Sequence, residues 1–326
     1  MRVLVTGGAG YVGSRLVAHL LAHGHAVRVF DRLLYGGEAL LPLTALPGFD
    51  LRVGDVRDGA TLAAALDGVE AVIHLAGIVG EPACNVDPAF AWSVNQGAVP
   101  TLLQAARQAT VRQLLFISTC SNYGVAAPNT EVDEDAPLNP VSDYARAKVL
   151  SERAVLGDND LPVATVLRLG TICGLSARMR FDLLVNEMAR DTVLQRPVTI
   201  FAPAAWRPFL HIDDAAEAMR RVLQADPARI NRRVLNVVGE NHQKTGLIAI
   251  AKAYRPDMAV SIVDKQPDLR DYRVNGARFA AAIGFRPSRS VASAFREVAH
   301  AVRDGLFANT DWPGHSATPI DGFRPH

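Results

Sequence analysis

The sequence predicts an α/β protein built on a doubly wound parallel sheet, with a smaller C-terminal lobe interleaved with it. Short β-branched runs alternate with amphipathic stretches along the first half of the chain, which is the rhythm of parallel βαβ units. The strand-like runs are apolar throughout, as expected when helices cover both faces of a sheet. With 326 residues, of which 49% are hydrophobic, the chain can bury a core of this size.

Each expected element follows from a local pattern. The run 2–6 is apolar and β-branched and ends at a glycine-rich turn, and 11–23 repeats apolar residues at helical spacing. The same alternation continues along the chain. Further strands are expected at 26–30, 51–56, 71–76, 114–119, 163–169 and 232–239, and further helices at 58–68, 92–109 and 142–156.

The rhythm loosens after the strand at 163–169, which suggests a second unit. The expected division is a sheet domain at 1–170, to which 206–238 returns, and a substrate-binding lobe formed by 171–205 and 239–306. Residues 307–326 are rich in Pro, Gly and polar side chains without a regular period, so we expect a surface tail or an arm docked on a neighbour.

Charge and cysteine content exclude several classes of protein. The formal net charge of +1 provides no footprint for nucleic acid or for an anionic membrane. The apolar start of the chain meets glycines after a few residues, so no targeting or membrane segment is expected. Cys84, Cys120 and Cys173 are far apart and lack metal-ligand spacing, which predicts neither disulfides nor a metal site and favours a reducing cytoplasm.

The first strand and helix are joined by a glycine-rich turn that predicts dinucleotide binding. Gly7, Gly8, Gly10 and Gly13 leave the backbone open to a diphosphate at the start of the helix, whose free amides face an anion. Asp31 closes the second strand 18 residues after Gly13, where it should accept hydrogen bonds from the adenosine ribose of a Rossmann-bound cofactor. A carboxylate there favours NAD over NADP.

Two side chains leave these predictions open. Arg32 follows Asp31 and could hold a 2′-phosphate, although a solvated arginine is the simpler interpretation. Tyr144 and Lys148 share one side of a predicted helix, and this spacing alone does not separate proton chemistry from an ordinary (i, i+4) contact.

Several motifs, taken together and in order, resemble the extended short-chain dehydrogenase/reductase family of nucleotide-sugar epimerases and dehydratases. Two further stretches, 178–188 and 267–275, look most like a branch that oxidises C4 of nucleotide-linked hexoses or heptoses. The motifs that carry the family resemblance are Gly7-x-x-Gly10-x-x-Gly13, GDVRD around Asp55, HLAG at 74–77, STCSNYG at 118–124, Tyr144-x-x-x-Lys148 and WRPFLHIDDAA at 206–216.

The resemblance implies roles for individual residues. Tyr144 would be the catalytic base, Lys148 would bind the nicotinamide ribose, and Thr119 would bond the sugar hydroxyl. The cofactor NAD would be held by Gly7, Gly10, Tyr11, Val12, Gly13, Asp31, Asp55, Val56, Leu75, Ala76, Gly77, Asn95, Tyr144 and Lys148.

The proposed base needs help from positive charge. The pKa of a tyrosine hydroxyl is ordinarily about 10, so base chemistry near neutral pH requires a lower value. A cation at about 4 Å contributes about 4 kcal/mol at an effective dielectric constant of about 20. Lys148 and the positive nicotinamide ring are therefore expected to lower the pKa of Tyr144.

The sequence departs from the family in the substrate half. The dehydratases carry an Asp-Glu pair after the catalytic threonine, whereas this chain has Cys120 and Ser121, which disfavours ordinary 4,6-dehydration. Thr171 replaces the usual substrate-contacting asparagine. The residues expected to contact the nucleotide sugar are Thr119, Cys120, Ser121, Thr171, Asn186, Arg207 and Arg270, with Arg178 and Arg180 open between surface charge and phosphate binding.

The leading functional hypothesis is an NAD-dependent nucleotide-diphosphate-sugar 4-epimerase that works through a transient 4-keto sugar. The alternatives are a C4 dehydrogenase that releases the keto sugar and NADH, a 4,6-dehydratase-like enzyme and a non-catalytic NAD-binding regulator. His74 and His211 are interpreted as packing or hydrogen-bonded histidines. The helices at 92–109 and 142–156 resemble the pair that forms homodimers in this family, and a homodimer is expected.

Overall fold

The computed structural model describes residues 1–127, 130–263 and 269–318. Its centre is one sheet in which every neighbouring pair of strands is parallel, with β1 and β4 side by side in the middle. From edge to edge the strands are β11 (Arg233–Val237), β7 (Val163–Leu169), β5 (Gln113–Thr119), β4 (Ala71–His74), β1 (Arg2–Thr6), β2 (Ala26–Asp31) and β3 (Phe49–Val53).

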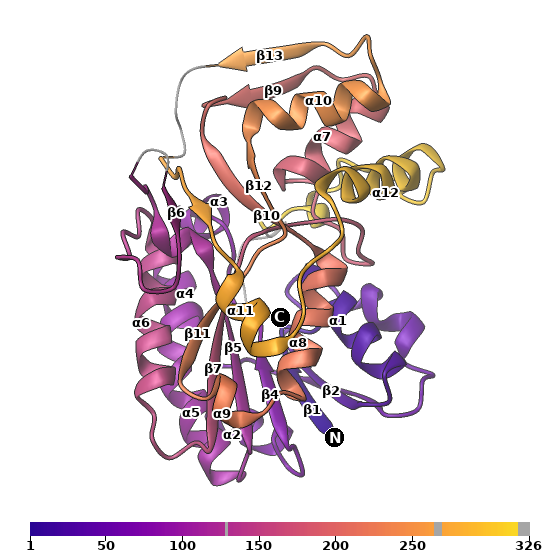
Figure 1. Cartoon of the computed structure of the whole chain (residues 1–326). Helices are drawn as coiled ribbons and strands as arrows, with labels where there is room; N and C mark the ends of the chain where they lie inside the picture. The colour runs from indigo at the N-terminus through magenta and orange to yellow at the C-terminus, as the bar shows by residue number, and fades with distance from the viewer. Residues whose placement is uncertain (128–129, 264–268, 319–326) are drawn as a thin grey trace.

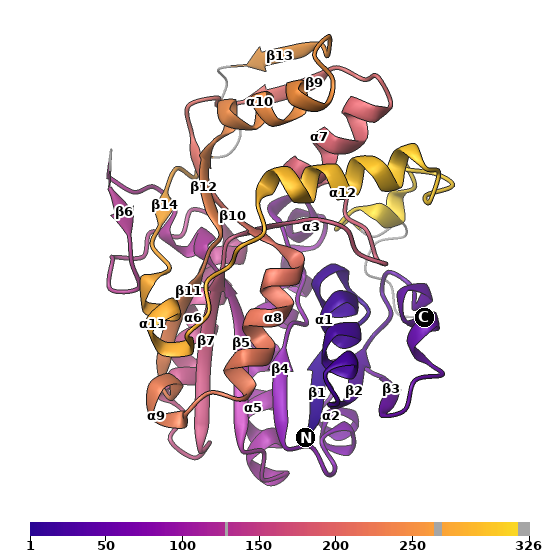
Figure 2. The same ribbon diagram turned by 45° about the vertical axis from the view of Figure 1, so that its right-hand side comes forward.

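Helices cover both faces of this sheet, which confirms the doubly wound fold (Figure 2). The apolar side chains of β1 alternate between the two faces, with Leu4 in one core and Val3 and Val5 in the other. On one face lie α2 (Gly59–Ala65), α5 (Ala98–Gln108) and α6 (Asp143–Gly157), and on the other lie α1 (Tyr11–Ala22), α8 (Ile212–Leu223) and α11 (Ala277–Ile283).

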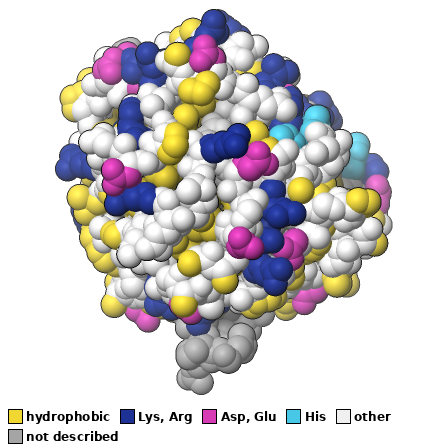
Figure 3. Space-filling view, turned by 90° about the horizontal axis from the view of Figure 1, so that it is seen from below, with side chains coloured by type: hydrophobic (Ala, Val, Ile, Leu, Met, Phe, Trp, Pro, Cys, Tyr) yellow, Lys and Arg dark blue, Asp and Glu magenta, His cyan; other side chains and the backbone are white. Residues whose placement is uncertain are grey.

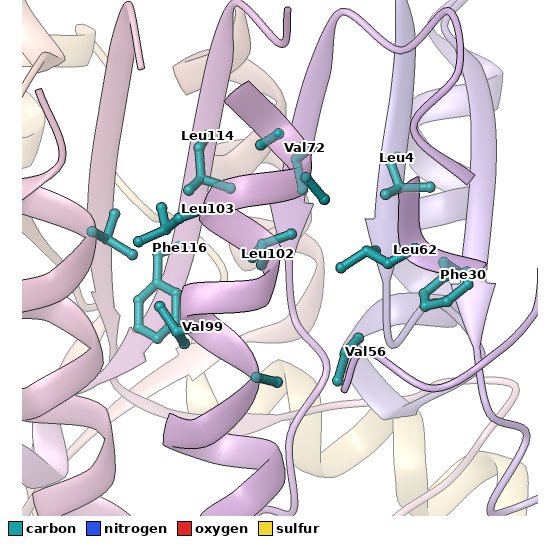
Figure 4. Close-up of a cluster of buried hydrophobic side chains, with 14 of the residues drawn as sticks. Leu4, Phe30, Val56, Leu62, Val72, Val99, Leu102, Leu103, Leu114 and Phe116 are labelled. Atoms are coloured by element: carbon teal, nitrogen blue, oxygen red, sulfur yellow. The ribbon is translucent and has the colours of Figure 1, made fainter. Parts of the chain in front are cut away.

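The first core shows how closely the helices pack on the sheet (Figure 4). Leu102 and Leu103 of α5 lie with Leu114 and Phe116 of β5, and all four are almost fully buried. Burying one such side chain contributes about 1.5–3 kcal/mol. The amphipathic stripes that predicted these helices therefore face the sheet.

A smaller lobe sits beyond the carboxyl ends of the strands (Figure 1). It holds a three-stranded sheet, a two-stranded sheet and three helices that share a core of their own. Its elements are β8 (Thr171–Cys173), β10 (Trp206–His211), β12 (Glu240–Gln243), β9 (Val198–Phe201), β13 (Val260–Val263), α7 (Leu184–Val193), α10 (Lys244–Tyr254) and α12 (Val291–Arg303).

The boundary between the two units is more interleaved than predicted. Residues 206–211 were expected to return to the large sheet, but as β10 they pair with β8 and β12 of the lobe, and the return begins with α8. Within the predicted lobe segment, α11 packs on β11 and buries Phe279 in the core of the large sheet. Long-range strand pairing and burial decide both placements, and neither is visible in local sequence.

The predicted helix 92–109 is three consecutive pieces. They are α4 (Pro88–Trp92), a π-helical turn at Ser93–Gly97 and then α5. A π turn leaves a backbone carbonyl outside the usual ladder, and here the Asn95 carbonyl accepts a hydrogen bond from Ser151 Oγ of α6 at 2.9 Å. The turn thus fastens α5 to α6 beside Asn95.

Short elements complete the described chain. The helical segments that remain are η1 (Glu38–Leu43), α3 (Glu81–Val86), η3 (Cys120–Tyr123), α9 (Pro227–Ile230) and η4 (Pro313–His315), and β6 (Glu131–Val132) pairs with β14 (Arg273–Val274).

The described part of the tail docks on this chain rather than standing free. Phe307 and His315 pack edge-on against Phe181, and the Phe181 amide donates to the His315 carbonyl at 2.8 Å. The predicted tail also includes 319–326, which lie outside the described residues.

The surface carries both signs of charge. Lysines and arginines are interspersed with acidic side chains on the face seen in Figure 3. None of the described helices combines the length and the apolar composition that crossing a bilayer would require.

A buried ion pair joins α6 to the large sheet. Glu152 of α6 accepts three hydrogen bonds from the Arg168 guanidinium of β7, at 2.6 Å and 3.2 Å to Oε2 and at 3.0 Å to Oε1. Its Oε1 also accepts from Ser118 Oγ at 2.5 Å and from Asn122 Nδ2 at 2.8 Å. The side chains of both charged residues are about 5% exposed or less. In this low-dielectric setting each hydrogen bond is stronger, and leaving either charge unpaired is costly.

Removing one charge of this pair should destabilise the fold strongly. We expect Glu152→Gln to lower the free energy of unfolding by about 3–5 kcal/mol, because it leaves the buried Arg168 without a counter-ion. Urea denaturation measures this. The control is Asp143→Asn, which breaks an exposed pair with Arg146 and should cost less than about 1 kcal/mol. Equal losses in the two variants would contradict the role given to Glu152.

Candidate active site

The glycine turn between β1 and α1 forms one wall of a cavity of about 320 Å³ at the carboxyl ends of the strands. Gly7 has φ +73°, and a Cβ there would meet the Ala76 amide nitrogen at 2.7 Å. At Gly13 a Cβ would collide with the Gly7 carbonyl oxygen. Only glycine permits this close approach of β1, β4 and α1, which is where the strand order reverses and where α/β sheets bind ligands.

Asp31 is positioned at one end of the cavity. Its carboxylate accepts from the Ala9 amide at 2.9 Å and from the Leu33 amide at 2.8 Å. Burial raises the pKa of this carboxyl, and these backbone hydrogen bonds oppose the increase. Each oxygen retains accepting capacity for a ribose hydroxyl, which fits the role predicted for Asp31.

Arg32 is not a solvated arginine. Its guanidinium lies 3.5 Å from Asp55 and 5.2 Å from the centre of the Phe90 ring, which also lies under Arg57. Arg57 makes a closer pair with Asp55 at 2.7 Å. Asp55, the first aspartate of the GDVRD motif, is thus held by two arginines at the rim of the cavity.

The residues predicted to bind NAD converge on this cavity, with one exception. Asn95 stands behind the wall, where its amide exchanges two hydrogen bonds of 2.9 Å with the backbone of Ile78. Its Oδ1 lies 2.8 Å from where a Gly77 Cβ would be. The predicted residues that line the cavity are Gly7, Gly10, Tyr11, Val12, Gly13, Asp31, Asp55, Val56, Leu75, Ala76, Gly77, Tyr144 and Lys148.

Thr119 of β5 and Tyr144 and Lys148 of α6 line the same cavity, and β4 and β1 lie between β5 and β2, the strand that carries Asp31. Thr119 ends β5 and caps η3, its Oγ1 accepting from the Ser121 amide at 3.0 Å. Ser142 caps α6 by accepting from the Ala145 amide, which starts the helix one residue before Tyr144. The chain therefore brings a hydroxyl, a phenol and an ammonium group to one place.

Burial controls the ionisation of this group of side chains. It raises the pKa of Tyr144, and the neighbours that lower it most are Arg180 and Arg270. Lys148 donates to the Ile117 carbonyl at 2.9 Å and lies 4.8 Å from the centre of the Phe116 ring, and burial lowers its pKa to about 8. From the sequence, Lys148 and the nicotinamide ring were expected to lower the pKa of Tyr144. Within the chain, the two arginines, which come from distant segments, lower this pKa most.

A second polar cluster adjoins the catalytic end. Arg270 Nη1 donates to Ser121 Oγ at 2.8 Å, and the Tyr272 hydroxyl donates to the same oxygen at 3.4 Å. Arg207 donates to the carbonyls of Trp206 and Arg270 and lies 5.9 Å from the centre of the Tyr272 ring. These two arginines and Ser121 lie together without lining the dinucleotide cavity, whereas Thr171 lines it.

Two residues predicted to contact substrate face elsewhere. Cys120 is 2% exposed, its thiol donates to the Arg168 carbonyl at 3.3 Å, and burial raises its pKa. Asn186 is fully buried and bonded to the Tyr11 hydroxyl, the Gly174 amide and the Arg180 carbonyl. These internal bonds use both N–H donors and one acceptor position of its amide, so Asn186 supports the cavity wall.

The two histidines have structural partners. His74 pairs with Thr6 Oγ1 at 2.9 Å, and burial lowers its pKa to about 3, so this ring is neutral. His211 Nε2 lies 3.1 Å from Glu297, and its Nδ1 caps α8 by accepting from the Asp213 amide. Both interactions are of the kind expected from the sequence.

Sequence reasoning missed a third wall of the cavity. Tyr35, Arg178, Arg180 and Ala317 line it, although they come from three separate segments. The sequence leaves the two arginines of RMRFDLL open between surface charge and phosphate binding, because no periodic signal distinguishes an arginine that lines a cavity from one on the surface. Tyr35 and Ala317 lie in irregular segments and carried no signal.

The fold and this cavity define a dinucleotide-binding protein of the Rossmann class, with a tyrosine–lysine pair at the reactive end. A model of the NAD dependent epimerase/dehydratase family matches residues 3–238. The chain belongs to the NAD-dependent epimerase/dehydratase family, and its cofactor is NAD.

Individual relatives agree with this membership. A UDP-glucose 4-epimerase of Corynebacterium glutamicum is 32% identical over 250 residues, covering 71% of this chain and 74% of that protein. A 3 beta-hydroxysteroid dehydrogenase/Delta 5-->4-isomerase of Mycobacterium tuberculosis is 38% identical over 203 residues and 59% of this chain. That match covers 52% of the relative, so the chain spans about half its length.

A solved structure matches nearly the whole chain. The dTDP-glucose 4,6-dehydratase of Streptomyces venezuelae, with NAD and TYD bound, has a TM-score of 0.82 and 28% identity, covering 96% of this chain and 98% of that one.

The buried Lys148 should make the stability of the cofactor-free chain depend on pH. Between pH 8 and the ordinary lysine pKa of about 10.5, the unfolded state binds more protons than the folded state, so stability rises with pH. Between about pH 7 and about pH 9.5, we expect the free energy of unfolding of the wild type to rise by on the order of 2 kcal/mol relative to that of Lys148→Met. Denaturant titrations at each pH measure this difference.

Lys252→Met on α10 is the matched control, because Lys252 is exposed and its removal should leave the pH dependence unchanged. If the free energies of unfolding of wild type and Lys148→Met differed by a constant amount over the same pH range, burial would not lower the pKa of Lys148, which would contradict this account.

Proposed function

We propose that this protein is an NAD-dependent nucleotide-diphosphate-sugar 4-epimerase. The observation that carries the proposal is that Thr119, Tyr144 and Lys148 line the same cavity as the glycine turn, with Arg207 and Arg270 beside its reactive end. The similarity to a UDP-glucose 4-epimerase over most of both chains supports the sugar class.

The chain's own groups support a proton transfer at one hydroxyl. Thr119 Oγ1 and the Tyr144 hydroxyl would bond the C4 hydroxyl, and Tyr144 would accept its proton. In the chain alone, burial outweighs the positive charge of Arg180 and Arg270 and keeps the pKa of Tyr144 raised, so the positive nicotinamide ring would have to supply the further lowering that proton acceptance requires. The glycine turn and Asp31 would hold NAD, which would supply an acceptor for the C4 hydride and a donor for its return to the other face of the transient 4-keto sugar.

The two arginines suit the diphosphate of the substrate. Arg207 and Arg270 come from β10 and the segment after β13, and both converge on the cluster around Ser121 and Tyr272. A guanidinium offers paired donors that match phosphate oxygens. This arrangement favours a nucleotide-diphosphate ligand over an uncharged alcohol.

A dehydrogenase is the second candidate. The 38% identity with a 3 beta-hydroxysteroid dehydrogenase favours it, and the Tyr144 and Lys148 of this chain could equally serve net alcohol oxidation. Such an enzyme, including a C4 dehydrogenase acting on a nucleotide-linked hexose or heptose, would release NADH. A 4,6-dehydratase is disfavoured, because positions 120 and 121 carry no carboxylic acid and the Cys120 thiol is buried against a carbonyl.

The product test separates these functions. The protein is incubated with catalytic NAD and a panel of nucleotide hexoses and heptoses, and products are followed by proton NMR together with absorbance of NADH. The proposal expects a C4 epimer without accumulating NADH. A keto product with stoichiometric NADH would establish the dehydrogenase instead.

Tyr144→Phe should abolish turnover and leave cofactor binding nearly intact. Loss of a general base costs about 100- to 10,000-fold in rate, whereas the phenyl ring still fills its place in the cavity wall. NMR turnover and calorimetric NAD affinity measure the two effects. Full turnover by this variant would exclude the proposed mechanism. A wild type that binds NAD but turns over no substrate of the panel would instead fit a regulator without catalytic activity.

The homodimer and the cytoplasmic location stay predictions. For the homodimer we propose the face of α6 as the contact, since Leu150 is 40% exposed there. Light scattering at several protein concentrations tests it.

A further inference from the structure

Arg178, in the segment between β8 and α7, is a buried cation to which no described residue gives an ionic partner. It is 7% exposed and lines the dinucleotide cavity, with its guanidinium 4.2 Å from the centre of the Tyr35 ring. Its Nη2 donates to the Ser316 carbonyl at 2.5 Å, while its Nε is buried without a hydrogen-bond partner among the described residues. Within the ranges that the structure describes, Arg178 forms no salt bridge.

The nearby carboxylates are engaged by other groups. Asp182 forms a salt bridge with Arg180 at 2.6 Å, and Asp31 accepts from two backbone amides. Burial, followed by the repulsion of Arg180, lowers the pKa of Arg178 to about 10. Keeping an unpaired guanidinium buried is costly unless an anion completes its surroundings.

The placement of Arg178 selects which anion that is. Asp31, at the end of the cavity assigned to the adenosine ribose, contributes a Coulomb attraction to Arg178. The glycine turn and the start of α1 line the same cavity and offer backbone amides to a diphosphate. A guanidinium across the cavity would supply the counter-charge that these neutral amides lack.

The C-terminal segment 316–318 completes the enclosure. The Tyr35 hydroxyl donates to the Ala317 carbonyl at 2.6 Å, and the Ala317 amide donates to Asp182 at 3.2 Å. Ala317 lines the cavity and is 6% exposed. The Arg178 guanidinium is therefore held in place between the Tyr35 ring and the Ser316 carbonyl. Its Nε, which has no hydrogen-bond partner among the described residues, is thus positioned in advance for an anion.

We propose that Arg178 binds the diphosphate of NAD and that residues 316–318, joined to it through Ser316 and to Tyr35 through Ala317, close the cavity and retain the cofactor. This inference concerns cofactor binding and holds whichever sugar reaction the enzyme performs.

The affinity test uses the full-length chain and calorimetry with NAD, ADP-ribose and adenosine. Arg178→Met should weaken NAD and ADP-ribose by about 10- to 100-fold and adenosine by less than about twofold, because only the first two carry the diphosphate. Arg52→Met, which removes an exposed arginine of β3, is the matched control and should change none of these affinities.

Two results would overturn the assignment to NAD. One is an unchanged ADP-ribose affinity in Arg178→Met. Arg178 would then have a purely structural role, and a lower melting temperature of the variant would not change that conclusion. The other is a loss of affinity confined to UDP, titrated into the same variants as a further ligand, which would assign the guanidinium to the nucleotide sugar. Neither result depends on whether the protein epimerises a sugar.

The retention test uses Tyr35→Phe, which keeps the ring beneath Arg178 and removes the hydroxyl donated to Ala317. Release of NADH, followed by fluorescence after addition of excess NAD, should be about 3- to 10-fold faster than in the wild type, as expected for one lost hydrogen bond. An unchanged release rate would overturn the part of the proposal that concerns residues 316–318.

Discussion

The buried pair between Glu152 and Arg168 is the interaction on which the catalytic geometry depends. Glu152 lies two turns after Tyr144 and one turn after Lys148 on α6, and it bonds both Arg168 of β7 and Ser118, the residue before Thr119. One carboxylate thus fixes the rotation of α6 relative to β5 and β7. Because the three reactive side chains come from α6 and β5 alone, this lock sets their mutual positions.

The same buried pair explains why the reactive phenol and the cations that lower its pKa come from different parts of the molecule. Closing α6 onto the sheet buries Tyr144 and Lys148, which raises the pKa of the phenol and lowers that of the ammonium. Positive charge must then arrive from outside these two elements. Arg180 comes from the segment before α7 and Arg270 from the segment after β13, so the small lobe supplies cations to a phenol held by the large sheet.

The sequence was most informative where structure is decided over a short range. The glycine turn, the alternating strands and the helix that presents Tyr144 and Lys148 each follow from a few consecutive residues, and they are found as expected. Ion pairs between residues far apart in the chain, such as Glu152 with Arg168, leave no periodic signal. Asn186 shows the other limit, since a resemblance of motifs gives its position in the chain but not the direction of its amide, which bonds to the Tyr11 hydroxyl within the cavity wall.

The central claim is that C4 of a nucleotide sugar is oxidised and reduced again by one enclosed cofactor. It is tested most directly with a mixture of two copies of a substrate that turns over, one carrying deuterium at C4 and the other carrying ¹³C throughout the ring with hydrogen at C4. Mass spectrometry of the epimer should find deuterium retained at C4 and only on the ¹²C ring. Loss of deuterium to water, or its release in free NADH, would contradict the account.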